Sequence, residues 1–95
     1  MRDRLLERHR SEILRVASSH GARNVRVFGS RARGEGDEQS DVDILVELER
    51  GRTLLDLVRL KRELEELTHR DVDVVTDDGL SPILRDTILS QAVAL

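Results

Sequence analysis

The chain has 95 residues, 37% of them charged, and a formal net charge of only −3, which favours one small domain over residues 1–95 and indicates neither a broad nucleic-acid footprint nor a polybasic membrane patch. It lacks cysteine, so disulfides and thiolate metal sites are excluded, and no apolar run approaches the roughly 20 residues of a membrane span. Charged residues follow Met1 in place of a signal peptide, so we expect a cytoplasmic protein that binds neither nucleic acid directly nor a membrane.

The first half of the chain predicts a helix followed by two strands. Apolar residues recur at helical spacing from residue 2 to about 20, and Gly21 is a natural stop for that helix. Residues 24–28 alternate and are β-branched, which predicts a strand. A polar stretch then leads to residues 41–48, where valine, isoleucine and leucine alternate with acidic residues. We expect a second strand there, with Asp41 and Asp43 on one face.

The second half predicts a helix, a strand and a closing helix. Thr53 and Asp56 have the spacing of a capping box, and the leucine pattern after them continues to about residue 68. Residues 72–76 form a short β-branched run and predict a third strand. Ser81 followed by Pro82 indicates a helix start, and the apolar spacing carries that helix to the end of the chain.

This order, α-β-β-α-β-α, predicts an α+β fold with a small three-stranded mixed sheet flanked by helices. The end of the first strand should lie beside the start of the second, so these two strands run antiparallel. The third strand follows a helical crossover and should run parallel to the second. Their functional ends would then meet at one end of the sheet.

The segment between the first two strands has the chemistry of a phosphate site. Gly29 has no Cβ to obstruct a phosphate oxygen, and Ser30 adds a hydroxyl donor to the backbone amides of the turn. Arg31 and Arg33 follow and could aim at phosphates, although a basic loop in an arginine-rich chain explains Arg33 equally well and Arg31 better. We therefore predict nucleotide binding by Gly29, Ser30 and Arg33.

Acidic residues on the second and third strands have the chemistry of a magnesium site. An Asp-x-Asp pair is a weak signal alone, since ten aspartates in 95 residues give about one such pair by chance. Asp41 and Asp43, however, begin a strand just after the Gly-Ser segment, about 6.5 to 7 Å apart on one face, a spacing that suits two metal ions. Asp73 would complete the second site, whereas Asp71 is expected to be a solvated strand start. We predict that Asp41, Asp43 and Asp73 are catalytic and bind two Mg²⁺ ions.

The runs Gly29-Ser30-x-Ala32-Arg33-Gly34, Ser40-Asp41-x-Asp43 and Val72-Asp73-x-Val75-Thr76 resemble the minimal nucleotidyltransferase family of the DNA polymerase β-like superfamily. The resemblance covers nearly the whole chain. It implies the nucleotidyltransferase fold, ATP as substrate, and an antitoxin role in a HEPN/MNT toxin–antitoxin pair. It further implies transfer of AMP from ATP to a tyrosine of the HEPN ribonuclease toxin, with which the chain would form a hetero-oligomer.

Two alternatives to this function remain open from the sequence. The chain could neutralise a toxin by binding alone, without transfer. Transfer to a small molecule or to RNA is disfavoured, because such relatives usually carry an additional helical domain and no basic or aromatic strip offers RNA a track.

Overall fold

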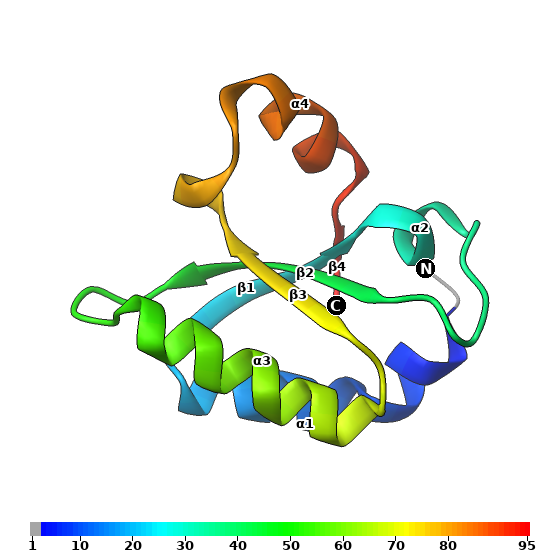
Figure 1. The fold of residues 1–95 in the computed structure, drawn as a ribbon, viewed down its shortest axis with the longest axis horizontal. Helices are drawn as coiled ribbons and strands as arrows, with labels where there is room; N and C mark the ends of the chain where they lie inside the picture. The colour runs from blue at the N-terminus through cyan, green and yellow to red at the C-terminus, as the bar shows by residue number, and fades with distance from the viewer. Residues whose placement is uncertain (1–2) are drawn as a thin grey trace.

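A four-stranded mixed sheet organises the fold in the computed structural model, which describes residues 3–95 (Figure 1). The strands lie in the order β3-β2-β1-β4. The strands are β1 (Ala22–Phe28), β2 (Val42–Leu48), β3 (Val72–Thr76) and β4 (Val93–Ala94), and the helices are α1 (Arg4–Ser19), α2 (Gly29–Arg33), α3 (Leu54–Thr68), the 3₁₀ turn η1 (Asp77–Gly79) and α4 (Pro82–Gln91).

Strand directions and register follow the predicted topology. β1 pairs antiparallel with β2, placing Phe28 opposite Asp43, and β2 pairs parallel with β3, placing Asp43 opposite Asp73. The parallel pair is joined by α3, the crossover that a parallel connection requires. The mixed α+β class and the relative directions of the first three strands are therefore confirmed.

The core lies between one face of the sheet and the two long helices. Figure 1 shows α1 and α3 side by side against this face. The helices and strands contribute aliphatic residues whose exposure is 8% or less, and burying a valine, leucine or isoleucine side chain contributes about 1.5–3 kcal/mol. The core members are Leu6, Ile13, Ala17, Ala22, Val25, Val27, Val42, Ile44, Val46, Leu60, Leu64 and Val72.

Capping interactions fix where the helices begin. The Asp3 side chain accepts a hydrogen bond from the Leu6 amide and caps α1. Thr53 and Asp56 form the predicted capping box, in which the Asp56 carboxylate accepts from the Thr53 amide at 2.8 Å. Ser81 caps α4, whose first residue is Pro82, as predicted. These local signals are satisfied by side chain to backbone hydrogen bonds, so the helix starts agree with the sequence pattern.

The opposite face of the sheet carries α2 and α4, and α4 packs loosely. No residue of α4 is buried, and Ile83 and Leu84 are 88% and 54% exposed. In Figure 1, α4 stands away from the strands, joined to them by η1 and β4. This face is thus less covered by helices than the one against α1 and α3. Within residues 3–95 no helix has the length and apolar character needed to cross a membrane.

Two sequence-based predictions about the sheet were wrong. The sheet has four strands instead of three, because the last helix ends at Gln91 and Val93–Ala94 pair with β1. The apolar spacing of residues 92–95 suits a helix as well as a strand, but pairing satisfies the open edge of β1, where the Leu95 amide donates to the Val25 carbonyl at 3.0 Å. β1 also begins at Ala22 instead of residue 24.

Candidate active site

Gly29 lies where β1 ends and α2 begins, in direct contact with an acidic side chain of β2. Its φ is +76°, and a Cβ built there would lie 2.2 Å from Oδ2 of Asp43. Both the backbone conformation and the space therefore require glycine. The predicted Gly-Ser turn is the first turn of a five-residue helix, which ends at Gly34 with φ 74°.

Asp43 and Asp73 form a close carboxylate pair on neighbouring strands. The parallel register sets their Cα atoms side by side, and their carboxyl groups are within hydrogen-bonding reach of each other. Burial, followed by the charges of Asp73 and Asp41, raises the pKa of Asp43 above its ordinary value. A partly buried carboxylate, Asp43, thus lies beside an exposed one, Asp73, and a bound cation would offset the repulsion between them.

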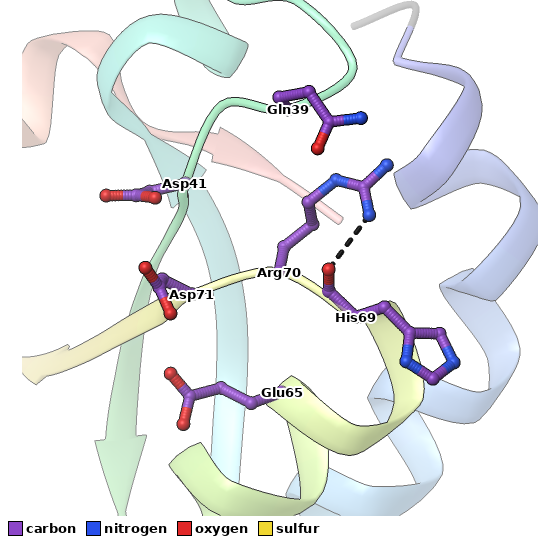
Figure 2. A pocket seen from close by; sticks show the side chains of 6 residues that line it. All are labelled: Gln39, Asp41, Glu65, His69, Arg70 and Asp71. Carbon is purple, nitrogen blue, oxygen red and sulfur yellow. Dashed lines mark hydrogen bonds between the residues drawn. The ribbon is translucent and has the colours of Figure 1, made fainter.

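Asp41 lies just before β2 and is exposed. Its charge acts on Asp43, but its side chain also lines a pocket of about 390 Å³ together with Asp71. Figure 2 shows the carboxylates of Asp41, Asp71 and Glu65 on one side of this pocket, with His69 on the other. Across residues 3–95, no three acidic, histidine or cysteine side chains are arranged as a ready metal-binding group. The structure thus brings Asp43 and Asp73 together, with Asp41 beside them at the pocket.

Ser30 and Arg33 extend from α2 at the same end of the sheet. The Ser30 hydroxyl faces Gly36, and the Ser30 backbone carbonyl accepts hydrogen bonds from the Glu35 and Gly36 amides. Arg33 is exposed, and its guanidinium donates to Glu35 at 2.8 Å and to Gln91 at 3.2 Å. Its positive charge weakly opposes the burial and the acidic neighbours that raise the pKa of Asp43. Arg33 therefore lies within electrostatic reach of the acidic pair.

Arg31 is buried, and the sequence did not predict this. Its side chain is only 2% exposed and forms an ion pair with Asp3 at 2.7 Å. The sequence left its role open between a phosphate contact and part of a basic loop, and the structure places the Arg31 side chain in the interior against Asp3. No local pattern distinguishes Arg31 from Arg33, since the partner Asp3 is 28 residues away in the chain.

The chain is similar to proteins of known family. The sequence profile of the nucleotidyltransferase domain matches residues 8–95. A Methanocaldococcus jannaschii protein designated a candidate protein adenylyltransferase is 50% identical over 82 residues, covering 86% of this chain and 88% of its own length. Protein adenylyltransferase MntA of Thermococcus cleftensis is 38% identical over 89 residues, covering 94% of this chain and 87% of its own.

Solved structures agree with the sequence comparisons. A candidate minimal nucleotidyltransferase superposes with a TM-score of 0.84 at 51% identity, covering 95% of this chain and 92% of that one. A toxin–antitoxin crystallised with AMP-PNP gives a TM-score of 0.76 at 22% identity, covering 88% of this chain and 69% of that one. The latter likeness concerns the fold.

Proposed function

Because this chain belongs to the nucleotidyltransferase family of enzymes, we propose that it transfers AMP from ATP to a tyrosine hydroxyl of a HEPN ribonuclease toxin and so acts as an antitoxin. The relatives named protein adenylyltransferase support a protein acceptor. The observation that carries the proposal is the Asp43–Asp73 pair, held in register on adjacent strands directly against Gly29. Such a pair faces the segment at which the triphosphate would bind.

In this proposal, α2 and its flanking residues bind the nucleotide. Backbone amides near Gly29 and Ser30 would donate to phosphate oxygens, which the missing side chain at position 29 leaves accessible. Arg33 would exchange Glu35 for a phosphate oxygen. Breaking the ion pair with Glu35 costs little free energy, because an exposed ion pair of this kind contributes only about 0–1 kcal/mol.

Asp41, Asp43 and Asp73 would hold Mg²⁺, which when bound supplies charge neutralisation at the triphosphate and at the attacking oxygen. Burial, followed by the charges of Asp73 and Asp41, raises the pKa of Asp43, and a bound divalent cation would offset both influences. Hard carboxylate oxygens are the ligands that Mg²⁺ prefers.

The transfer balances without a further reactant. The tyrosine oxygen attacks the α-phosphorus of ATP and loses its proton to solvent, while the bond from that phosphorus to the bridging oxygen breaks and pyrophosphate leaves. The chain's part is to orient the two reactants and to hold charged groups in fixed positions, which are the main sources of rate in phosphoryl transfer.

Neutralisation of the toxin by binding alone is a second candidate. The apolar exposure of Ile83 and Leu84 on α4 favours it, because such side chains suit a protein contact. This candidate requires no catalysis, so it predicts that toxin neutralisation survives loss of the acidic pair.

Incubation with radiolabelled ATP, Mg²⁺ and the HEPN toxin encoded beside the gene tests the proposal. Unaltered protein should label the toxin, and Asp43→Asn should reduce labelling at least about 100-fold. Asp78→Asn, which changes an exposed aspartate outside the site, is the matched control and should label normally. Equal labelling by Asp43→Asn would overturn the assignment.

Thermal melting of the same variant separates a loss of catalysis from a loss of folding. Since burial and repulsion make the Asp43 carboxylate unfavourable in the folded state, Asp43→Asn should melt no lower than the unaltered protein when Mg²⁺ is absent. If Asp43→Asn fails to label the toxin yet neutralises it at equal expression, binding alone is the function.

A further inference from the structure

Arg31 is a buried cation with three separate partners. Its Nη1 donates to Asp3 Oδ2 at 2.7 Å, and its Nε and Nη2 donate to the Ser40 carbonyl at 3.0 and 2.8 Å. Nη2 also donates to the Glu38 carbonyl at 2.8 Å. A buried charge is tolerated only when it is paired and hydrogen-bonded, and here one carboxylate and two carbonyls supply that environment.

These bonds join α2 to the connection that follows it and to the start of α1, which lies 28 residues earlier in the chain. Arg31 lies on α2, immediately after Gly29 and Ser30, whereas Asp3 caps α1 by accepting from the Leu6 amide at 3.0 Å. The remaining acceptors belong to residues 34–41, the connection between α2 and β2. One guanidinium therefore fixes the distance between the phosphate segment, the start of α1 and this connection.

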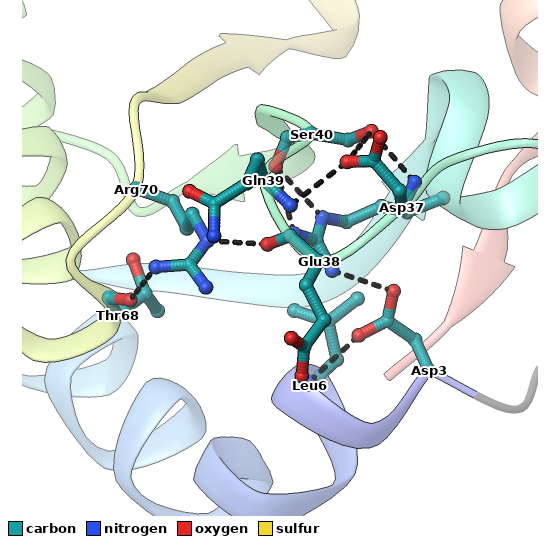
Figure 3. A network of polar contacts seen from close by, with 9 residues as sticks. Asp3, Leu6, Asp37, Glu38, Gln39, Ser40, Thr68 and Arg70 are labelled. Atoms are coloured by element: carbon teal, nitrogen blue, oxygen red, sulfur yellow. Dashed lines mark hydrogen bonds and ion pairs between the residues drawn. The ribbon is translucent and has the colours of Figure 1, made fainter.

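The connection is held just before the acidic residues. Ser40, whose carbonyl accepts two bonds from Arg31, directly precedes Asp41. Figure 3 shows Arg70 donating to the Glu38 carbonyl. Arg31 donates to the same carbonyl, so two arginines bind it. The backbone of residues 38–40, which leads into β2, is therefore held in position by arginine side chains from outside the strand.

We propose that Arg31 is a positioning residue that fixes residues 38–41 and thereby holds Asp41 and Asp43 in place for nucleotidyl transfer. The inference rests on the proposed function for the identity of the reaction. Arginine donates here from three separate nitrogens, Nε, Nη1 and Nη2, whereas the three donors of lysine all lie on one nitrogen and cannot reproduce this spacing. The role therefore depends on hydrogen-bond geometry more than on positive charge.

Amide hydrogen exchange tests this role without measuring activity. In Arg31→Met, peptides covering residues 35–42 should exchange about tenfold faster or more, because hydrogen bonds from a charged donor are lost at two carbonyls. Arg31→Lys should show the same acceleration, although it keeps the charge beside Asp3. The double variant Arg31→Met/Asp3→Asn avoids leaving Asp3 as a buried unpaired charge and should show the same loosening.

Two controls separate positioning from stability. Arg15→Met removes an exposed arginine of α1 and should change nothing. Ile13→Val trims the core and should accelerate exchange in proportion to the global stability it removes, without singling out residues 35–42. Two results would overturn the proposal. One is exchange in Arg31→Lys at the rate of the unaltered protein. The other is an acceleration in Arg31→Met that is no greater over residues 35–42 than in the rest of the chain.

Kinetics give the second readout. Arg31→Met and Arg31→Lys should lower kcat for toxin labelling about tenfold or more with a smaller change in KM for ATP, because the acids lose their position while α2 keeps its phosphate-facing backbone. A change confined to KM would instead assign Arg31 to nucleotide binding.

If the unaltered chain labels no acceptor, the proposed function fails. If exchange over residues 35–42 is unchanged in Arg31→Met, the role of Arg31 fails, and the two results are independent.

Discussion

At position 29 the backbone occupies space that any side chain would have to share with Asp43. The positive φ alone disfavours other residues, but the decisive feature is the 2.2 Å separation between a Cβ at this position and Asp43 Oδ2. Gly34 provides a natural comparison, since its φ is 74° and no atom lies within 4 Å of a Cβ built there. Backbone strain and steric displacement can therefore be measured separately in one chain.

Gly29→Ala and Gly34→Ala should each lose about 1–2 kcal/mol of stability from the left-handed conformation. Only Gly29→Ala should also abolish transfer, because its methyl group displaces the Asp43 carboxylate. Urea unfolding measures the first effect and labelling of the acceptor the second. Equal activity of the two variants would show that the contact at Gly29 does not matter for the reaction.

Some residues of the candidate site could be recognised from the sequence, and Arg31 could not. Gly29, Asp43 and Asp73 could be singled out because their residue types and spacing match a phosphate and metal site, and the structure brings them together. Arg31 could not, because its burial depends on Asp3 and on carbonyls of residues 38 and 40, none of which is specified by the local sequence. Long-range polar partners are fixed by packing, which a local pattern does not contain.

Among the elements, α3 and β3 are tied together by a small polar cluster beside the pocket. Glu65 accepts hydrogen bonds from the Val72 amide at 3.1 Å and from Lys61 Nζ at 3.0 Å, and Lys61 donates in turn to the Val72 carbonyl at 2.6 Å. The backbone bond to Val72, followed by Lys61, lowers the pKa of Glu65 below its ordinary value of 4.5. The start of β3, and with it Asp73, is thus anchored to the crossover helix.

Glu65→Gln should lower the melting temperature at neutral pH, because the neutral amide loses the charge-assisted bonds. A depressed folded-state pKa gives stability that is present above the unfolded value and is lost as pH falls through the folded pKa. The difference between the two proteins should therefore shrink below about pH 4.5. Glu66→Gln, at the next and exposed position, is the control. A difference that stays constant as the pH is lowered would contradict this account.

Element boundaries were predictable wherever a local signal existed. The capping box at Thr53 and the proline after Ser81 gave two helix starts, and the β-branched run 72–76 gave β3 with its observed bounds. β4 was missed because residues 93–94 become a strand only through pairing with Arg26 and Val27 of β1. Tertiary hydrogen bonding overrode the helical spacing there.

Considered as a whole, the molecule is built asymmetrically about its sheet. One face is sealed by α1 and α3 through the aliphatic core, whereas the other carries the acidic pair, α2 and the exposed α4. The η1 turn that leads into α4 is held by the bidentate pair of Arg26 with Asp77 and by a bond from Arg85 to the Asp77 carbonyl. Polar contacts of this kind hold α4 in place, whereas buried apolar side chains hold α1 and α3.

Hydrogen exchange of the isolated chain should reveal this asymmetry. Amides of α4 should exchange at least about tenfold sooner than those of α3, because local opening costs little where few apolar side chains are buried. Arg26→Met should accelerate exchange in α4 further and leave α1 unchanged. Equal protection of α4 and α3 would mean that α4 unfolds only with the whole molecule.

The side-by-side placement of positions 43 and 73 also limits how the length of such a chain can drift during evolution. Since successive residues of a strand point to opposite faces, deleting one residue inside β3 ahead of Asp73 would turn its carboxylate toward the aliphatic layer. An insertion at residues 49–52, where the backbone turns outside any strand, leaves that pairing intact. Homologues should therefore vary in the reach of their turns and hardly at all in the count of residues within the two parallel strands.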